Sequence, residues 1–191
     1  MRYTRGMSDS SYRSQFLIAL PTLGGDYFSD AVILLIDHTD EGAFGLVVNK
    51  PTDIASNDLL DGNDARDFPV MSGGPVSPGR LFFIHEPSID ESSYEAMMTV
   101  TDGVCLTTSA DLIAELEQGV GPDKIMALLG YAGWGAGQLE QEMADDVWLM
   151  APASANVVFD VPCDDRPLSA ARNLGIDLNL LLHTQSDSQS S

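Results

Sequence analysis

Positive charge is what this sequence has least of. Among its 191 residues only nine are lysine or arginine, against 29 aspartates and glutamates, so the formal net charge is −20. Proteins that bind duplex DNA displace condensed counterions with clustered basic groups. The nearest thing to a cluster, Arg2, Arg5 and Arg13, lies in a polar segment at the start of the chain. The charge therefore predicts solubility and disfavours contact with nucleic acid or an anionic membrane surface.

Long apolar segments and cysteines are also scarce. The longest uninterrupted apolar run, residues 31–36, is far shorter than the ~20 residues that a membrane helix needs. Arg2 and Arg5 precede no leucine-rich segment, so no secretory signal is visible. Cys105 and Cys163 are too few for a disulfide framework. We therefore expect a cytoplasmic protein with reduced thiols and without contact to a membrane.

What the sequence does contain is enough apolar residues, 44%, for one globular core. Short apolar runs bounded by turn residues predict strands at 14–20, 31–37, 43–49, 80–85, 104–107, 125–129, 147–151 and 157–161. Helical spacing and capping residues predict helices at 54–60, 108–118 and 136–145 and a last helix after Asp164-Asp165, whereas 94–100 fits either state. The strands cluster as hairpins. We therefore expect an α+β fold with a mixed or antiparallel sheet and several short helices packed on it.

The polar composition of both ends predicts tails. Residues 1–13 show no apolar period and are expected to be a flexible N-terminal tail. Residues 184–191 are rich in serine and are expected to be a disordered C-terminal tail. No repeat and no linker interrupts the chain between them. The sequence therefore predicts a single domain over 14–183.

Residues 130–149, a glycine-rich turn with Tyr131 and Trp134 followed by a polar helix, have the strictest local chemistry. Their spacing matches neither a dinucleotide fingerprint nor a P-loop. Glu140 and Glu142 occupy the first turns of the expected helix and would repel a phosphate there. A structural turn is the first interpretation, because glycine is the usual residue of tight turns. The second is a loop for a neutral or peptide ligand, and the third is a phosphate site.

Ser72-Gly73-Gly74 could supply free N–H groups beside a hydroxyl, as an oxyanion loop does. It does not match the Gly-x-Ser-x-Gly motif, and no base is placed near it by the sequence. A tight turn is the favoured interpretation, because glycine pairs are typical of turns.

The histidines and cysteines form no recognised metal or catalytic motif. His38 and His85 each end a strand beside an acid, and His183 lies near the C-terminus. No His-x-His, His-Glu-x-x-His or Cys-x-x-Cys spacing occurs, so we expect neither a metal nor a cofactor. Cys105 lies in an apolar strand and resembles a buried small hydrophobe. Cys163 lies beside two aspartates, which disfavour a reactive thiolate.

Five blocks of sequence, in order along the chain, resemble the AlgH/YqgE family. They are FLIALP (16–21), DHTDEGAFGLVVNKP (37–51), GGPV (73–76), LTTSADL (106–112), and LGYAGWGAGQLEQE with WL (129–142 and 148–149). The resemblance spans nearly all of 14–176. It implies a small bacterial cytosolic protein of α+β fold. Members are often labelled putative transcriptional regulators, and no reaction is established for the family.

The sequence departs from the family pattern at three places. Asp145-Asp146 stand where an asparagine is usual, and Pro167 stands where a tryptophan commonly follows the arginine. The usual glycine-histidine-alanine ending is missing. The resemblance therefore implies no role for the family's tail in this chain.

Three hypotheses of function follow. The leading one is a non-enzymatic binding or regulatory protein that captures a protein or small-molecule ligand in a cleft of glycine turns and aromatic residues. The second is a hydrolase that uses His38 or His85 with nearby acids and the Ser72 region, and the third is the transcriptional regulator of the family label. We predict no catalytic residue. The candidate binding residues are His38, Asn49, Gly73, Gly74, His85, Tyr131, Trp134, Gln138 and Glu140.

Overall fold

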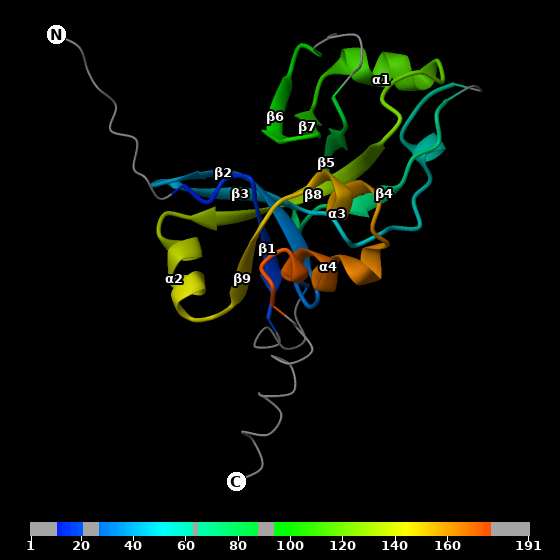
Figure 1. Cartoon of the computed structure of the whole chain (residues 1–191). Coiled ribbons are helices and arrows are strands. Elements are labelled where there is room, and N and C mark those ends of the chain that lie inside the picture. Colours follow the sequence, from blue (N-terminus) through cyan, green and yellow to red (C-terminus); the bar gives the residue numbers. More distant parts are fainter. Residues whose placement is uncertain (1–10, 21–26, 63–64, 88–93, 177–191) are drawn as a thin grey trace, which may run out of the picture.

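A single curled sheet dominates the computed structural model, which describes residues 11–20, 27–62, 65–87 and 94–176 (Figure 1). Eight strands follow the order β6-β7-β5-β8-β3-β2-β1-β9, and β4 pairs with β8 outside that path. All pairs are antiparallel except β4 with β8. The strands are β1 (Gln15–Ala19), β2 (Val32–Thr39), β3 (Gly42–Val47), β4 (Val70–Ser72), β5 (Val76–His85), β6 (Met97–Thr101), β7 (Val104–Thr107), β8 (Ile125–Gly135) and β9 (Trp148–Pro152).

Strand β8 is the long central strand that joins the two ends of this sheet. Along one edge it pairs with β5. Along the other edge it pairs first with β4, at 127–129, and then with β3, at 132–135. Gly130 lies between these two partners with a φ of +73°, a backbone conformation that favours glycine. A Cβ there would lie only 2.4 Å from the carbonyl oxygen of Gly74, so the glycine lets two backbones cross.

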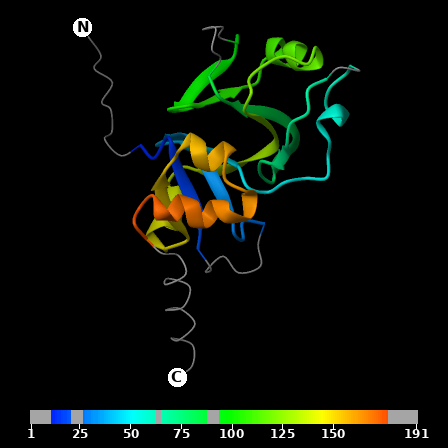
Figure 2. The ribbon, with the colours of Figure 1, turned by 45° about the vertical axis from the view of Figure 1, so that its right-hand side comes forward.

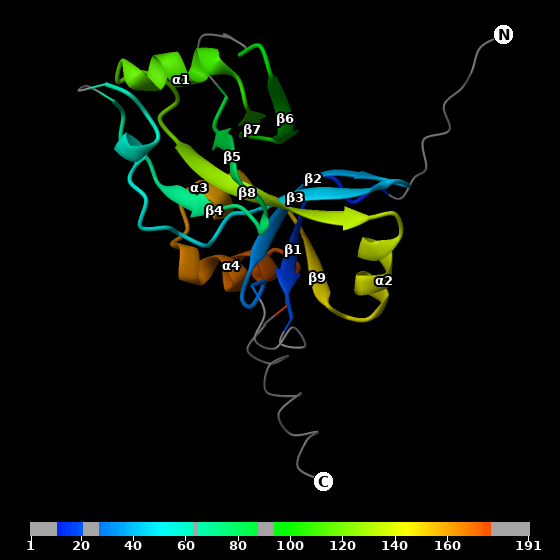
Figure 3. The same cartoon turned by 180° about the vertical axis from the view of Figure 1, so that it is seen from behind.

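The short helices cover both faces of the sheet. They are α1 (Ala110–Glu117), α2 (Gln138–Ala144), α3 (Ala155–Phe159) and α4 (Arg166–Arg172), with single 3₁₀ turns η1 (Ser56–Asp58) and η2 (Cys163–Asp165). Successive strand residues point to opposite faces, so each strand supplies two apolar layers. One face packs on residues of α3 and α4. The opposite face is covered near β1, β2 and β3 by α2 and near β5 by α1 (Figures 2 and 3).

The α+β fold is confirmed, and two of the expected elements are wrong. Residues 157–161 were expected to form a strand but belong largely to α3, because the Ser154 hydroxyl accepts the N–H of Val157 and caps a helix there. The helix expected at 54–60 is only the turn η1. The ambiguous segment 94–100 contributes to strand β6. The helix expected from 108 begins at Ala110.

The expected tails fall mostly outside the described residues, which begin at 11 and end at 176. Residues 11–13 belong to the expected N-terminal tail, yet they are placed and pack against β2. Within the described part of the chain, no helix has both the length and the apolar sequence needed to cross a membrane.

Candidate functional site

The end of the β2–β3 hairpin is shaped by a bulge. The register between the two strands shifts between Leu35 and Asp37, so that Asp37 pairs with Phe44 and His38 with Ala43. A bulge inserts one unpaired residue and changes which face the following side chains occupy. His38 therefore shares a face with Ala43 and α2, whereas Asp37 shares the opposite face with Phe44.

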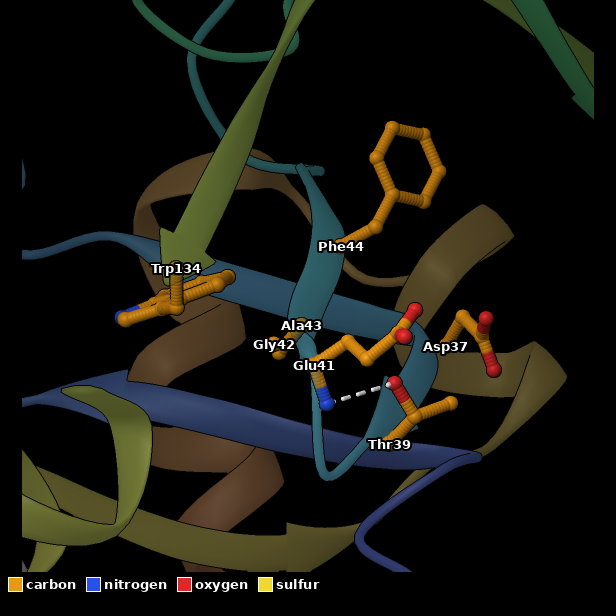
Figure 4. A pocket seen from close by; sticks show the side chains of 7 residues that line it. All are labelled: Asp37, Thr39, Glu41, Gly42, Ala43, Phe44 and Trp134. Carbon is orange, nitrogen blue, oxygen red and sulfur yellow. Dashed lines mark hydrogen bonds between the residues drawn. The ribbon is translucent and has the colours of Figure 1, made fainter. Parts of the chain in front are cut away.

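On the Asp37 face lies an open hollow of about 260 Å³, which we call the hairpin hollow (Figure 4). The hairpin supplies two carboxylates, a hydroxyl and an aromatic ring to its wall, and the end of β8 closes one side. The lining residues are Asp37, Thr39, Glu41, Gly42, Ala43, Phe44 and Trp134. Gly42 has a φ of +140°, and a Cβ there would lie 2.2 Å from the Trp134 carbonyl oxygen. This glycine is what allows the hairpin to lie so close to β8.

Three aromatic rings, which we call the aromatic triad, extend from the hairpin hollow across the sheet. The Phe44 ring lies 5.1 Å from Tyr131 and 5.5 Å from Phe82, measured between centroids. Phe82 and Tyr131 are 6.3 Å apart. Beyond them, the Arg80 guanidinium lies 5.1 Å from the centroid of the Phe82 ring. Phe44 and Tyr131 are only partly buried, so the triad offers an accessible apolar surface with an acidic end and a basic end.

Trp134 does not present its indole to a ligand, contrary to the expectation of an accessible aromatic cleft. Its side chain lies on the opposite side of β3 from Phe44 (Figure 4) and is 7% exposed. One Glu142 oxygen accepts the indole N–H of Trp134 at 2.8 Å and that of Trp148 at 2.7 Å. Gln138 accepts the Gly135 N–H at 3.0 Å and donates to the other Glu142 oxygen at 3.0 Å. These polar side chains fix α2 to the sheet.

His38 and Glu140 form a close pair beside that helix. The His38 Nε2 lies 2.7 Å from the Glu140 carboxylate, and its Nδ1 accepts the backbone N–H of Tyr12 at 3.2 Å. The pKa of Glu140 lies below its ordinary value because its own backbone N–H and then His38 hydrogen-bond the carboxylate. His38 is 9% exposed and Glu140 is at the surface. Of the predicted site residues, these two are brought together by the fold.

His85 is a core residue. It has no exposed surface, its Nδ1 donates to the Glu86 carbonyl at 2.7 Å, and its Nε2 accepts the Thr107 hydroxyl at 2.7 Å. The Tyr94 ring meets it edge-on, 5.5 Å between centroids. Burial lowers the pKa of His85, so the neutral imidazole is favoured.

Asn49 and the two glycines also have structural partners. The Asn49 amide oxygen accepts the Val32 N–H at 2.8 Å, and its amide nitrogen donates to the Asp30 carbonyl at 2.8 Å. Gly73 donates its N–H to the Leu129 carbonyl at 2.7 Å, which removes it as an oxyanion donor. A Cβ on Gly74 would lie 2.0 Å from the Tyr131 carbonyl carbon. The favoured interpretation, a tight structural turn, accounts for these contacts.

The residues of the hydrolase hypothesis lie at three separate places along β8. His85 lies opposite Ile125, Ser72 opposite Leu129, and the His38 partner Ala43 opposite Trp134. At ~3.3 Å per strand residue, these rungs are ~13 Å and ~17 Å apart, beyond the reach of side chains. The fold therefore does not assemble this catalytic set.

The described residues also hold no group of three or more His, Cys, Asp or Glu side chains placed to share a metal ion. Both cysteines are free, and burial raises the pKa of Cys105.

Sequence reasoning missed the residues that line the hairpin hollow. Phe44 lay in the strand expected at 43–49, Asp37 at the end of the strand expected at 31–37, and Glu41 in the polar turn between them. Their convergence depends on the bulge at Ile36 and on the pairing of β3 with β8. The local signal that was available was Gly42, which marks a close backbone approach.

Comparison with known proteins gives a consistent result. A family model described as AlgH-like matches residues 16–179. A UPF0301 protein of Thioalkalivibrio sulfidiphilus is 41% identical over 180 residues, covering 91% of this chain and 95% of that protein. A UPF0301 protein of Chromobacterium violaceum is 41% identical over 182 residues, covering 92% and 96%.

Two solved structures have the same fold. The solution structure of the AlgH protein from Pseudomonas aeruginosa matches with a TM-score of 0.73 at 35% identity, covering 93% of this chain and 96% of that one. A crystal structure of a protein from Corynebacterium diphtheriae matches with a TM-score of 0.71 at 18% identity, covering 87% and 89%, and this likeness concerns the fold alone.

Proposed function

The chain belongs to the AlgH-like family, and we propose that it is a non-enzymatic binding protein that captures a positively charged side chain of a partner protein in the hairpin hollow. The observation that carries this proposal is the hollow itself, where two carboxylates flank a partly exposed aromatic ring. Figure 4 shows Asp37 and Glu41 on the same side of the hairpin as Phe44. We therefore place the expected binding cleft at the Phe44 ring and not at the Trp134 indole.

The lining of the hollow suits a guanidinium group in particular. Carboxylates bind it through paired hydrogen bonds, and an aromatic face attracts it through its quadrupole. Arg80 over the Phe82 ring is an example within the same molecule. Among the described residues, the Glu41 side chain has no hydrogen-bond or ionic partner, so its charge is available to a ligand. The net charge of −20 adds a long-range attraction that steers a basic partner toward the protein.

A projecting side chain fits the hollow better than an enclosed metabolite does. Pockets that bury small ligands are typically ~300–1,000 Å³ and largely closed. The hairpin hollow, at about 260 Å³, is smaller and open to solvent. The acidic charge disfavours nucleic acid and anionic membranes as partners. A regulatory effect on transcription, as the family label suggests, would then act through a protein partner. Two free cysteines fit the reducing cytoplasm, where we place this activity.

A peptide titration tests the proposal. The probe is a fluorescent peptide with one arginine between glycines and serines, and the control peptide carries citrulline, which has the same shape without the charge. At low salt we expect the arginine peptide to bind. The double variant Asp37→Asn/Glu41→Gln should weaken that binding about tenfold, the sum of two exposed ion pairs and a weakened stack.

The matched control is Asp53→Asn, which removes an exposed acid outside the hollow. Its binding should equal that of the unmodified protein. Equal affinity for both peptides, or equal loss in the Asp53 variant, would show that the hollow is not the site.

A further inference from the structure

Residues 11–13, which we call the strap, are held against β2 although they lie outside the sheet. The Tyr12 ring stacks on the imidazole of His38, with centroids 4.7 Å apart and planes 11° from parallel. The backbone N–H of Tyr12 donates to the Nδ1 of the same imidazole at 3.2 Å. The Ser11 hydroxyl reaches the His38 carbonyl at 3.5 Å. A single histidine thus supplies most of the contacts that hold the strap.

These contacts define the protonation state of His38. A ring nitrogen that accepts an N–H carries no proton of its own, so Nδ1 is unprotonated when the strap is bound. The proton of the neutral ring then lies on Nε2, which donates to Glu140 at 2.7 Å. His38 therefore joins the strap to α2 as the neutral imidazole.

The strap also reaches the rim of the hairpin hollow. The Arg13 Nε donates to the Ile36 carbonyl at 3.3 Å and lies 3.6 Å from an Asp37 carboxylate oxygen. Asp37 is one of the two acids that line the hollow. With the strap bound, the protein's own arginine therefore competes with a ligand for that carboxylate.

We infer that His38 is a proton-sensitive clasp: its protonation at Nδ1 releases the strap and withdraws Arg13 from the hairpin hollow. A proton added at Nδ1 replaces the acceptor lone pair by a second N–H, so the Tyr12 N–H loses its partner and faces another donor. The imidazolium meanwhile gains an ion pair with Glu140, which keeps α2 in place. Histidine is the side chain that ordinarily changes charge between about pH 5 and 8.

Four groups surround the imidazole and influence this step. Glu140 from α2 favours the charged ring, because its carboxylate lies against Nε2. Asp37 also favours it, although its carboxylate is on the opposite face and accepts the His38 backbone N–H at 3.0 Å. Arg13, bound near Asp37, and the Tyr12 N–H oppose it. On β3, the cross-strand neighbour Ala43 carries no charge. The strap and the proton therefore compete for one nitrogen.

Nuclear magnetic resonance of the full ¹⁵N-labelled chain tests the clasp directly. At pH 8 the His38 ring should show an unprotonated Nδ1 and a protonated Nε2. As the pH falls to 5, protonation of His38 and loss of the hydrogen-bonded shift of the Tyr12 amide should follow one titration curve. A Tyr12 amide that keeps its bonded shift after His38 has titrated would overturn the inference.

Two variants of the same residue separate the two ring nitrogens. His38→Asn keeps an acceptor near the Nδ1 position but cannot be protonated, so its Tyr12 amide should not respond to pH. His38→Gln reaches toward Glu140 instead and should leave the strap released at every pH. A Tyr12 amide that titrates equally in the His38→Asn protein would contradict the clasp.

The consequence for binding rests on the proposed function and is measured separately. If the strap competes for Asp37, affinity for the arginine peptide should rise about threefold from pH 8 to pH 5.5, the value of one exposed ion pair. Without competition by Arg13, the affinity of Asp37 and Glu41 for the arginine peptide would stay constant or fall as the pH is lowered over this range. Absence of peptide binding at every pH would refute the proposed function, while the Tyr12 amide still decides on the clasp. Peptide binding whose affinity does not rise would refute the competition by Arg13.

Discussion

Two histidines, one near each end of β8, look alike in the sequence and differ in the fold. His85 and His38 each lie at the end of a strand beside an acid. At the β5 end, Thr107 and Tyr94 enclose His85 completely, and burial lowers its pKa. At the β3 end, His38 meets a terminal segment and a surface carboxylate. Residues distant in the sequence therefore decide which histidine is enclosed in the core and which contacts the strap and a surface carboxylate.

The helices that cover the two ends differ in the same way. Helix α1 closes its end with buried leucines, Leu112 and Leu116, which are fully excluded from solvent. Helix α2 also buries Leu139, but it adds contacts from acidic side chains to the sheet, through Glu142 to two indoles and through Glu140 to His38. The acids of α1 hydrogen-bond residues outside the strands, Tyr94, Glu95 and Asp61, whereas the acids of α2 hydrogen-bond side chains of the sheet itself. Those contacts of α2 can be removed one hydrogen bond at a time.

The largest expected effect on stability comes from the place where the Gly74 backbone lies against the Tyr131 backbone of β8. In the Gly74→Ala protein the new Cβ would lie 2.0 Å from the Tyr131 carbonyl carbon, which is backbone and cannot move aside. We expect the free energy of unfolding to fall by more than about 3 kcal/mol, measured by urea denaturation. Gly79→Ala is the control, because no atom lies within 4 Å of its Cβ, and should change stability little. If both variants lose the same free energy of unfolding, the close approach of Gly74 to β8 does not hold the two ends of the sheet together.

The second-largest expected effect on stability concerns the hydrogen bonds between α2 and the sheet. Glu142→Ala leaves the indole N–H groups of Trp134 and Trp148 without their acceptor in a buried site. At ~1–3 kcal/mol for each unsatisfied donor, we expect a loss of about 3 kcal/mol and a fall in melting temperature of ~10 °C. Glu142→Gln retains one acceptor oxygen and should lose much less. If alanine and glutamine are equally mild, the apolar face of α2 is sufficient to hold it on the sheet, and its polar contacts add no stability.

The sequence predicted the framework better than it predicted the site. The hairpin at 31–49 and the helix after Gly137 follow from local patterns, turn glycines and apolar runs. The bulge between Leu35 and Asp37 has no such signature, yet it decides that His38 faces α2 and that Asp37 faces the hollow. Trp134 was a candidate binding residue because it lies on a glycine-rich turn, but its indole N–H is accepted by Glu142, eight residues later. Contacts between distant elements cannot be read from local spacing.

The third effect is a dependence of stability on pH that belongs to the β5 end. The pKa of His85 is lowered in the folded protein, so below its unfolded value of ~6.5 the unfolded chain binds a proton that the folded chain does not. Stability contributed by His85 is thus present above that pH and is lost as the pH falls. From pH 7 to pH 5 we therefore expect the free energy of unfolding to fall, and His85→Gln should reduce that fall in urea titrations.

The control for that slope is the other histidine. His38→Gln should retain the loss between pH 7 and pH 5, because His85 is still present. If His38→Gln removes the slope and His85→Gln does not, the assignment of the two histidines is reversed.

The smallest effect tests how loosely the β3 end is held. Tyr12→Ala removes the ring stacked on His38, and Tyr12 is outside the sheet and only partly buried. We expect a loss of ~1 kcal/mol or less, the value of one aromatic pair, and a melting temperature within ~4 °C of the unmodified protein. Tyr12→Phe keeps the stacked ring and should be indistinguishable from the unmodified protein in the same calorimetric scan. A loss above ~3 kcal/mol in Tyr12→Ala would make the strap part of the core, and the β3 end would then be as closed as the β5 end.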